Sequence, residues 1–109
     1  MEFKEYQELA RQTAIYPNQG QNFTYPAMAL AGEAGEVAGK VSKILRAGEN
    51  ELSDEEREKI AGELGDVLWF LSQLSWEIKI PLEEIATRNL AKLKSRQERK
   101  LLEGDGDER

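Results

Sequence analysis

The chain has 109 residues and a formal net charge of −6 at pH 7, and it contains neither cysteine nor histidine. This length predicts one domain, residues 1–109 with residues 103–109 as a frayed tail, whose modest core is often completed by self-association. The acidic balance argues against nucleic acid and an anionic membrane surface as partners, and chemistry must use carboxylates, lysines, amides, hydroxyls or an oxygen-bound metal.

The apolar residues follow a helical period nearly throughout, and no segment has a clear strand pattern. The polar start has no run typical of a signal peptide, and no stretch reaches the roughly 20 apolar residues of a membrane span, so we expect a soluble, cytoplasmic protein. A first helix is predicted over residues 2–15. Residues 16–26, with two prolines and a glycine, are predicted to form a loop, and Pro26 starts the second helix.

The second and third helices carry the same apolar stripe, in alternating steps of four and three residues. The stripe consists of Leu30, Ala34, Val37, Val41 and Ile44 in the second helix, and of Ile60, Leu64, Val67, Leu71 and Leu74 in the third. Gly48 is the predicted C-cap of the second helix, and Ser53 and Glu56 form a predicted capping box for the third. Matching stripes joined by a short loop predict an antiparallel helical hairpin. Pro81 precedes a fourth helix over residues 81–102, so the predicted fold is an all-α antiparallel bundle of about four helices, completed by oligomerisation.

The heptapeptide AGEAGEV at residues 31–37 returns as AGELGDV at residues 61–67. The four acids of this repeat are Glu33, Glu36, Glu63 and Asp66. Heptad positions place all four on one side of the hairpin, with Glu33 level with Asp66 and Glu36 level with Glu63. Four like charges repel one another, and oxygen-only ligands favour Mg²⁺, with Mn²⁺ as a possible substitute, so we predict a metal site here. A solvated acidic face is the alternative for any single pair.

The glycines of the repeat support a crowded site. Gly32, Gly35, Gly62 and Gly65 each cost about 1 kcal/mol relative to alanine in a helix interior. We expect a neighbouring helix, a phosphate or the metal to approach the backbone there. Duplication of one ancestral helix explains the repeat equally well and does not compete with the metal site.

The spacing Glu33-x-x-Glu36, then 26 residues, then Glu63-x-x-Asp66, resembles the signature of the MazG-like nucleotide pyrophosphohydrolases, within the all-α NTP pyrophosphatase superfamily. The segments LAGEAGEVAGKVSKILR and ELGDVLWFLS are particularly similar to its small single-domain members, and the resemblance runs from about residue 6 to residue 96. It implies a Mg²⁺-dependent homodimer or homotetramer that hydrolyses nucleoside triphosphates to monophosphate and pyrophosphate.

The resemblance also assigns roles to residues. It implies that the four acids are both the metal ligands and the catalytic residues. It implies that substrate is bound by Lys43 and by the N-x-x-K-x-x-x-R pattern of the last helix, namely Asn89, Lys92 and Arg96. Members of the family differ in the loop at residues 15–25, so the resemblance does not extend to the choice of substrate there.

The chemistry is consistent with these residue types. Cleavage between the α- and β-phosphates needs an aligned water and neutralised charge, and a metal supplies both by activating the water and bridging phosphate oxygens. Lys40 and Lys43, joined by Lys59, continue the acidic face and are predicted to meet the distal phosphates; an ion pair of Lys40 with Glu36 is an equal alternative.

Other interpretations stay open at this point. Phe70 and Gln73 continue the acidic face at its other end, where a base or sugar could lie, whereas Trp69 and Trp76 are predicted to pack at a subunit interface. Hydrolysis of another nucleotide, such as phosphoribosyl-ATP, is the nearest alternative activity. A non-enzymatic helical interaction module is the alternative from a different class.

Overall fold

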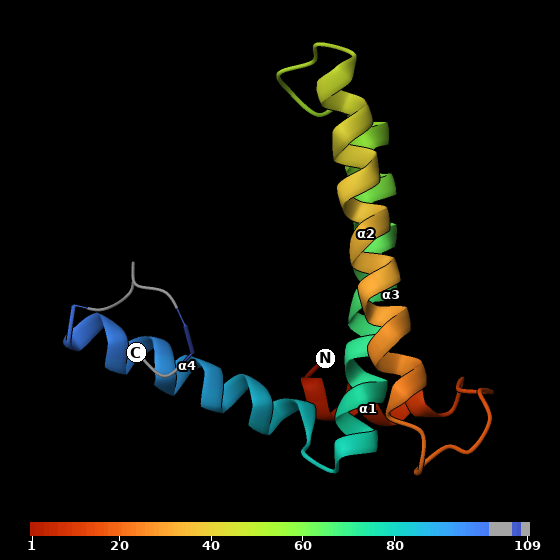
Figure 1. Ribbon diagram of the computed structural model, residues 1–109, viewed down its shortest axis with the longest axis vertical. Coiled ribbons are helices and arrows are strands. Elements are labelled where there is room, and N and C mark those ends of the chain that lie inside the picture. Colours follow the sequence, from red (N-terminus) through yellow and green to blue (C-terminus); the bar gives the residue numbers. More distant parts are fainter. Residues whose placement is uncertain (101–105, 108–109) are drawn as a thin grey trace.

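The computed structural model describes residues 1–100 and 106–107, which form four helices and no strand, as the all-α prediction requires. The helices are α1 (Phe3–Arg11), α2 (Thr24–Arg46), α3 (Asp54–Ile78) and α4 (Leu82–Glu98). Helices α2 and α3 form a long antiparallel hairpin, α1 packs across its base, and α4 extends away from it (Figure 1). The radius of gyration is 16.7 Å, whereas a compact domain of this size has about 13 Å. The single chain is therefore elongated.

The C-terminal end of α2 and the N-terminal end of α3, which meet at the hairpin turn, have the capping residues predicted from the sequence. Gly48 has a φ of +76°, and the amides of Gly48 and Glu49 donate back to carbonyls of the last turn of α2 at 3.0 and 3.3 Å. The Ser53 hydroxyl accepts from the amide of Glu56, whose carboxylate accepts from the amide of Ser53, which confirms the capping box. These two caps define the turn over residues 47–53.

Two helix ends come earlier than predicted. Helix α1 stops at Arg11 because both the amide and the hydroxyl of Thr13 donate to the carbonyl of Ala10, at 3.0 and 2.7 Å, and so replace the helical pattern. Helix α4 stops at Glu98. The predicted helix end at residue 102 and most of the predicted frayed tail lie outside the described residues.

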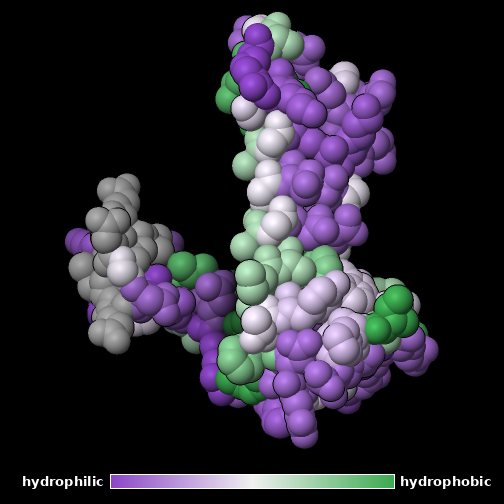
Figure 2. Space-filling model, turned by 45° about the vertical axis from the view of Figure 1, so that its right-hand side comes forward, coloured by the Kyte–Doolittle hydropathy of each residue, from purple (hydrophilic) through white to green (hydrophobic). Residues whose placement is uncertain are grey.

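The apolar stripes of the hairpin are only partly covered. Val41, Leu45 and Leu64 are 39, 68 and 53% exposed, although they occupy or flank the predicted seam. Figure 2 shows a strip of weakly hydrophobic surface along the hairpin beside a strongly hydrophilic face. None of the helices in the described part of the chain is long and apolar enough to cross a membrane.

The best-buried part of the molecule is the base of the hairpin, and its core is largely polar. The buried hydrophobic residues of the described chain are Ala10, Tyr16 and Leu82. Gln7 of α1 joins three helices there: its Nε2 donates to the Ser72 carbonyl and the Ser75 hydroxyl of α3 at 3.0 and 2.8 Å, and its Oε1 accepts from the amide of Leu82 in α4 at 3.0 Å. The base is therefore held by specific hydrogen bonds more than by apolar packing.

Candidate metal centre

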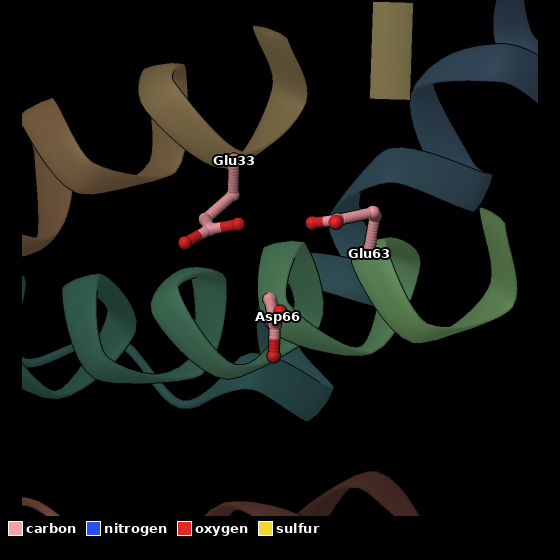
Figure 3. Close-up of side chains that lie close together, drawn as sticks. All are labelled: Glu33, Glu63 and Asp66. Atoms are coloured by element: carbon pink, nitrogen blue, oxygen red, sulfur yellow. The ribbon is translucent and has the colours of Figure 1, made fainter. Parts of the chain in front are cut away.

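Three carboxylates from the two hairpin helices meet in the middle of the hairpin (Figure 3). Oxygens of Glu33, Glu63 and Asp66 lie within 4.8 Å of one another. Glu33 reaches from α2 toward Glu63 on α3, and Asp66 lies on the same side of α3, one turn beyond Glu63. The fold thus brings together one acid of the first repeat and both acids of the second.

Glu36, the fourth predicted ligand, lies outside this group. Its side chain is exposed on α2. The Nζ of Lys40, one turn beyond Glu36 on α2, lies 3.4 Å from the Glu63 carboxylate. The meeting of Glu33 with Asp66 agrees with their predicted equal height, so Lys40 reaches Glu63 through its long side chain. Lys40 therefore forms its ion pair across the hairpin with Glu63. The alternative prediction, an ion pair with Glu36 of the same helix, is not observed among the described residues.

The crowding of charge changes the titration of Glu33. Loss of water contact raises the pKa of Glu33, and the negative charges of Asp66 and Glu63, a hydrogen bond with Glu63 and the charge of Glu36 raise it further. Carboxylates in such a group favour a shared proton or a bound cation. Glu33 and Glu63 are half-buried while Asp66 is exposed, so the group is open to a ligand. Three oxygen donors of this kind fit a hard divalent cation such as Mg²⁺ or Mn²⁺.

The lysines predicted to meet phosphates gather between the carboxylates and the turn over residues 47–53. Lys40, Lys43 and Lys59 line one pocket of about 220 Å³. The rest of its lining is Ile44, Glu56 and Ile60. The Nζ of Lys59 pairs with Glu55 at 3.0 Å, whereas Lys43 forms no ion pair within residues 1–100 and 106–107. A positive pocket therefore adjoins the carboxylates on the turn side.

The predicted substrate-binding residues of α4 lie apart from the carboxylates of their own chain. Asn89 is exposed, and Lys92 and Arg96 both contact the carboxylate of Asp107, at 2.5 and 3.2 Å. Helix α4 contacts α1 and α3 but not α2, and it points away from the hairpin (Figure 1). These three residues do not join the candidate metal centre within one chain.

Sequence reasoning missed Glu77, a carboxylate buried near the end of α3. It accepts hydrogen bonds from the backbone amides of Gly20 and Asn22 at 2.8 and 2.6 Å, from the Tyr16 hydroxyl at 2.7 Å, and from the Arg11 guanidinium at 3.3 Å. Burial raises the pKa of Glu77, but these hydrogen bonds outweigh burial and lower the pKa to about 2. Glu77 is therefore ionised and fully partnered by the protein itself.

A signal for Glu77 is present in the sequence. The face of α3 that carries Glu63 and Asp66 continues toward the base through Phe70, Gln73 and Glu77, in steps of three and four residues. Glu77 follows Glu63 by two heptads. Helical spacing thus places a further acid on this face beyond the repeat, whereas its contact with the distant loop is not encoded in that spacing.

The residues predicted to lie near a base or sugar have different environments. Gln73 is fully buried, and its Oε1 accepts from Arg11 at 2.9 Å, so its amide is used within the fold. Phe70 is half-buried and meets the Tyr25 ring edge-on at 5.9 Å. Trp69, predicted to pack at a subunit interface, donates from its indole to the Thr13 hydroxyl of the same chain at 2.8 Å. Of the two residues predicted near a base or sugar, Phe70 keeps a partly exposed apolar surface and Gln73 does not.

Comparisons with known proteins agree with the repeat and the fold. The MazG nucleotide pyrophosphohydrolase domain matches residues 21–100, which include both halves of the acidic motif. The chain is 43% identical over 109 residues to the gene 37 protein of Mycobacterium phage L5, covering 95% of this chain and 96% of that protein. No solved structure matches the chain. Since the family match spans most of the chain and all three hairpin carboxylates, the chain belongs to the MazG nucleotide pyrophosphohydrolase family.

Proposed function

We propose that the protein hydrolyses nucleoside triphosphates, ribo or deoxy, to nucleoside monophosphate and pyrophosphate in a Mg²⁺-dependent reaction. The observation that carries this proposal is the meeting of Glu33, Glu63 and Asp66 from the two halves of the repeat, in a chain of this family. Family membership supports nucleotide pyrophosphohydrolysis, and the triphosphate substrate and the metal are the finer steps that we add.

The proposed roles follow from the donor set. Glu33, Glu63 and Asp66 hold the ion, with Glu36, one turn along α2, as the fourth proposed ligand. Mg²⁺, or Mn²⁺ in its place, would supply positive charge to the phosphate oxygens and acidify the attacking water. A carboxylate of the group receives the proton of that water, because no histidine is available for this role.

The lysine pocket has a separate role in the proposal. Lys43 and Lys40 neutralise the β- and γ-phosphates, which leave together as pyrophosphate. Lys43 has no competing ion pair in the described chain, whereas Lys40 must exchange its contact with Glu63 for one with phosphate. We therefore expect Lys43 to contribute more to substrate affinity than Lys40.

We also propose that the active form is a homodimer or homotetramer. Around Gly32, Gly35, Gly62 and Gly65, apart from the surrounding backbone of the same helix, no described atom lies within 4 Å of where a Cβ would stand, so contacts with other parts of the described chain do not require glycine there. Close approach of a second copy or of the ligand would require it. In such an assembly the residues of α4 would meet the carboxylates of another copy.

The oligomer is tested by light scattering on two variants that each add one charge. Leu64→Glu on the half-covered hairpin face is expected to shift the assembly toward monomer. Ile15→Glu, at a position 95% exposed in the loop after α1, is the matched control and should leave the mass unchanged. An unchanged mass for Leu64→Glu would move the interface away from the hairpin.

The reaction is tested by a product assay with Mg²⁺ on a panel of NTPs and dNTPs, resolved by chromatography. Equal amounts of monophosphate and pyrophosphate are expected, with none in EDTA or with Glu63→Gln or Glu36→Gln. Glu58→Gln, an exposed acid of the same helix outside the repeat, is the control that should retain activity. Diphosphate with orthophosphate would contradict the cleavage position. Silence across the panel with Mg²⁺ still bound would favour a specialised nucleotide such as phosphoribosyl-ATP, and silence without Mg²⁺ binding would favour a helical interaction module.

A further inference from the structure

The loop over residues 16–22, which joins α1 to α2, is fastened to α3 by the single carboxylate of Glu77. One oxygen accepts from the Gly20 amide and the Tyr16 hydroxyl, and the other accepts from the Asn22 amide. These three donors span the loop, at 2.8, 2.7 and 2.6 Å. One side chain thus fixes the beginning, middle and end of the loop.

Arg11 contacts both Glu77 and the loop residue Tyr16. The guanidinium of Arg11 lies 3.3 Å from the Glu77 carboxylate and also donates to the Tyr16 hydroxyl at 2.6 Å and to Gln73 at 2.9 Å. The side chain of Glu77 is 1% exposed. Gly20 has a φ of +90°, a conformation that side-chain-bearing residues rarely adopt, and it directs its amide at Glu77. The loop conformation is therefore specified by a carboxylate that is itself shielded from water.

The fastened loop lies on the same side of α3 as the candidate metal centre. Glu77 and Asp66 share one face of α3 and are separated by eleven residues, or about 16 Å along the helix. Phe70 stands between them on that face, about 6 Å from Asp66 along the axis. The loop therefore covers the continuation of the acidic face toward the base of the hairpin.

Aromatic rings connect the loop to that face. Tyr16 stacks on Tyr25 with ring centroids 5.1 Å apart, and Tyr25 meets Phe70 edge-on at 5.9 Å. The Oδ1 of Asn22 accepts from the amide of Tyr25 at 3.1 Å, so the loop also sets where α2 begins. If the loop were released, Tyr16 and Tyr25 would lose their fixed position relative to the carboxylates.

We infer that Glu77 is a positioning residue, which fixes the loop over residues 16–22 so that the buried ring of Tyr16 holds the exposed ring of Tyr25 beside the space for the nucleoside part of a nucleotide held at the hairpin carboxylates. This inference rests on the proposed function, because it concerns the substrate of the same site. Glu77 is buried and touches no substrate, so it acts on substrate affinity and not on the chemical step.

Position 77 requires a carboxylate, because all of its hydrogen-bond partners are donors and both terminal atoms of the side chain must therefore be acceptors. Four groups donate to Glu77, and both of its oxygens are used. In Glu77→Gln one oxygen becomes an NH₂ group that faces a backbone amide, and Arg11 loses its charged partner. The shape of the side chain is kept while the fastening of the loop is lost.

The test compares steady-state kinetics of the parent and of Glu77→Gln with the best triphosphate of the panel. We expect KM to rise about tenfold, from the cost of ordering a released loop and its rings on each binding event, with kcat changed less than twofold. Mn²⁺ binding by calorimetry should be unchanged, because the carboxylates stay in place. Glu84→Gln, which removes an exposed acid of α4 paired with Arg88, is the matched control.

Amide hydrogen exchange tests the same inference without turnover. The amides of Gly20 and Asn22 should exchange slowly in the parent and at least tenfold faster in Glu77→Gln, while the amides of the middle of α3 keep their protection. Tyr16→Phe, which removes one donor and keeps the ring, should shift KM and exchange in the same direction by less. It also decides the question if Glu77→Gln does not fold.

The outcomes separate the inference from the proposed function. An active parent whose KM is unchanged in Glu77→Gln and Tyr16→Phe overturns the inference and leaves the proposed function standing. A fall in kcat with unchanged KM, or weaker Mn²⁺ binding, also overturns it. An inactive parent overturns the proposed function and the substrate part of the inference together, and exchange at Gly20 and Asn22 then still decides whether Glu77 fastens the loop.

Discussion

Carboxylates occupy two places along one face of α3, at Glu77 and at Glu63 with Asp66, and the surroundings of the two places are opposite. At the base, Glu77 is enclosed by four hydrogen-bond donors, and its pKa is lowered to about 2. In the middle of the hairpin, Glu33 meets Glu63 and Asp66, and its pKa is raised by lost water contact and by these neighbouring charges. The same chemical group is therefore satisfied by the protein in one place and left with like charges in the other.

This difference separates a structural carboxylate from a ligand-binding group. The charge of Glu77 already has a cation and three further donors, so nothing outside the chain is required. Within the described chain only Lys40 faces the hairpin carboxylates as an ion-pair partner, and it contacts Glu63 alone. An added divalent cation would supply the missing charge there, whereas the charge of Glu77 is already compensated by Arg11 and three further hydrogen-bond donors.

The comparison predicts that the largest loss of stability comes from the satisfied carboxylate. Breaking a buried charge pair on one side typically costs 3–5 kcal/mol, so Glu77→Gln should lower the free energy of unfolding by about 3 kcal/mol or more. Glu84→Gln, which removes an exposed acid, should change it by less than about 0.5 kcal/mol. Urea unfolding at pH 7 measures both. Equal midpoints for the two variants would mean that the Glu77 network does not stabilise the fold.

The second prediction concerns turnover at the unsatisfied group. Asp66→Asn should lower kcat/KM by more than about 100-fold, because even changes outside the ligand shell of a metal site cost 10–100-fold. The fold should persist, since Asp66 is exposed. Asp54→Asn, at the exposed start of the same helix, is the control for loss of an acidic charge and should keep turnover within twofold. Comparable losses in both variants would indicate an effect of net charge and not of a metal ligand.

The third prediction uses pH to distinguish the two regions. Because the folded-state pKa of Glu77 lies below its ordinary value of 4.5, its contribution to stability is full above about pH 4.5 and is lost as pH falls toward about 2. The stability difference between the parent and Glu77→Gln should therefore shrink between pH 5 and pH 3. Urea midpoints across this range measure the difference. A constant difference would show that the amide variant fails for steric reasons.

The sequence predicted the hairpin itself better than it predicted the surroundings of each carboxylate. Local signals were sufficient for the hairpin, since the Gly48 and Ser53 caps depend on residues within one turn of each other. Equal heights on the hairpin predicted the meeting of Glu33 with Asp66, but heptad positions do not specify which long side chain reaches Glu63, and in the fold it is Lys40. The network of Glu77 depends on a loop more than fifty residues away in sequence, beyond the reach of helical periodicity.

The smallest expected effect is the sharpest test of repulsion in the hairpin. Without metal, Asp66→Asn should raise the melting temperature by about 1–3 °C, because it removes one of several like charges on a shared face. Asp66 suits this test better than Glu63, whose loss would also break the contact with Lys40 and offset the gain. The melting temperature of Asp66→Asn should lie above that of the parent in EDTA and below it in excess Mg²⁺. The sign changes because Mg²⁺ stabilises only the folded protein that keeps its ligands. A lower melting temperature for Asp66→Asn in EDTA would mean that the metal-free carboxylates are already stabilised from within the chain, and the contrast with Glu77 would then fail.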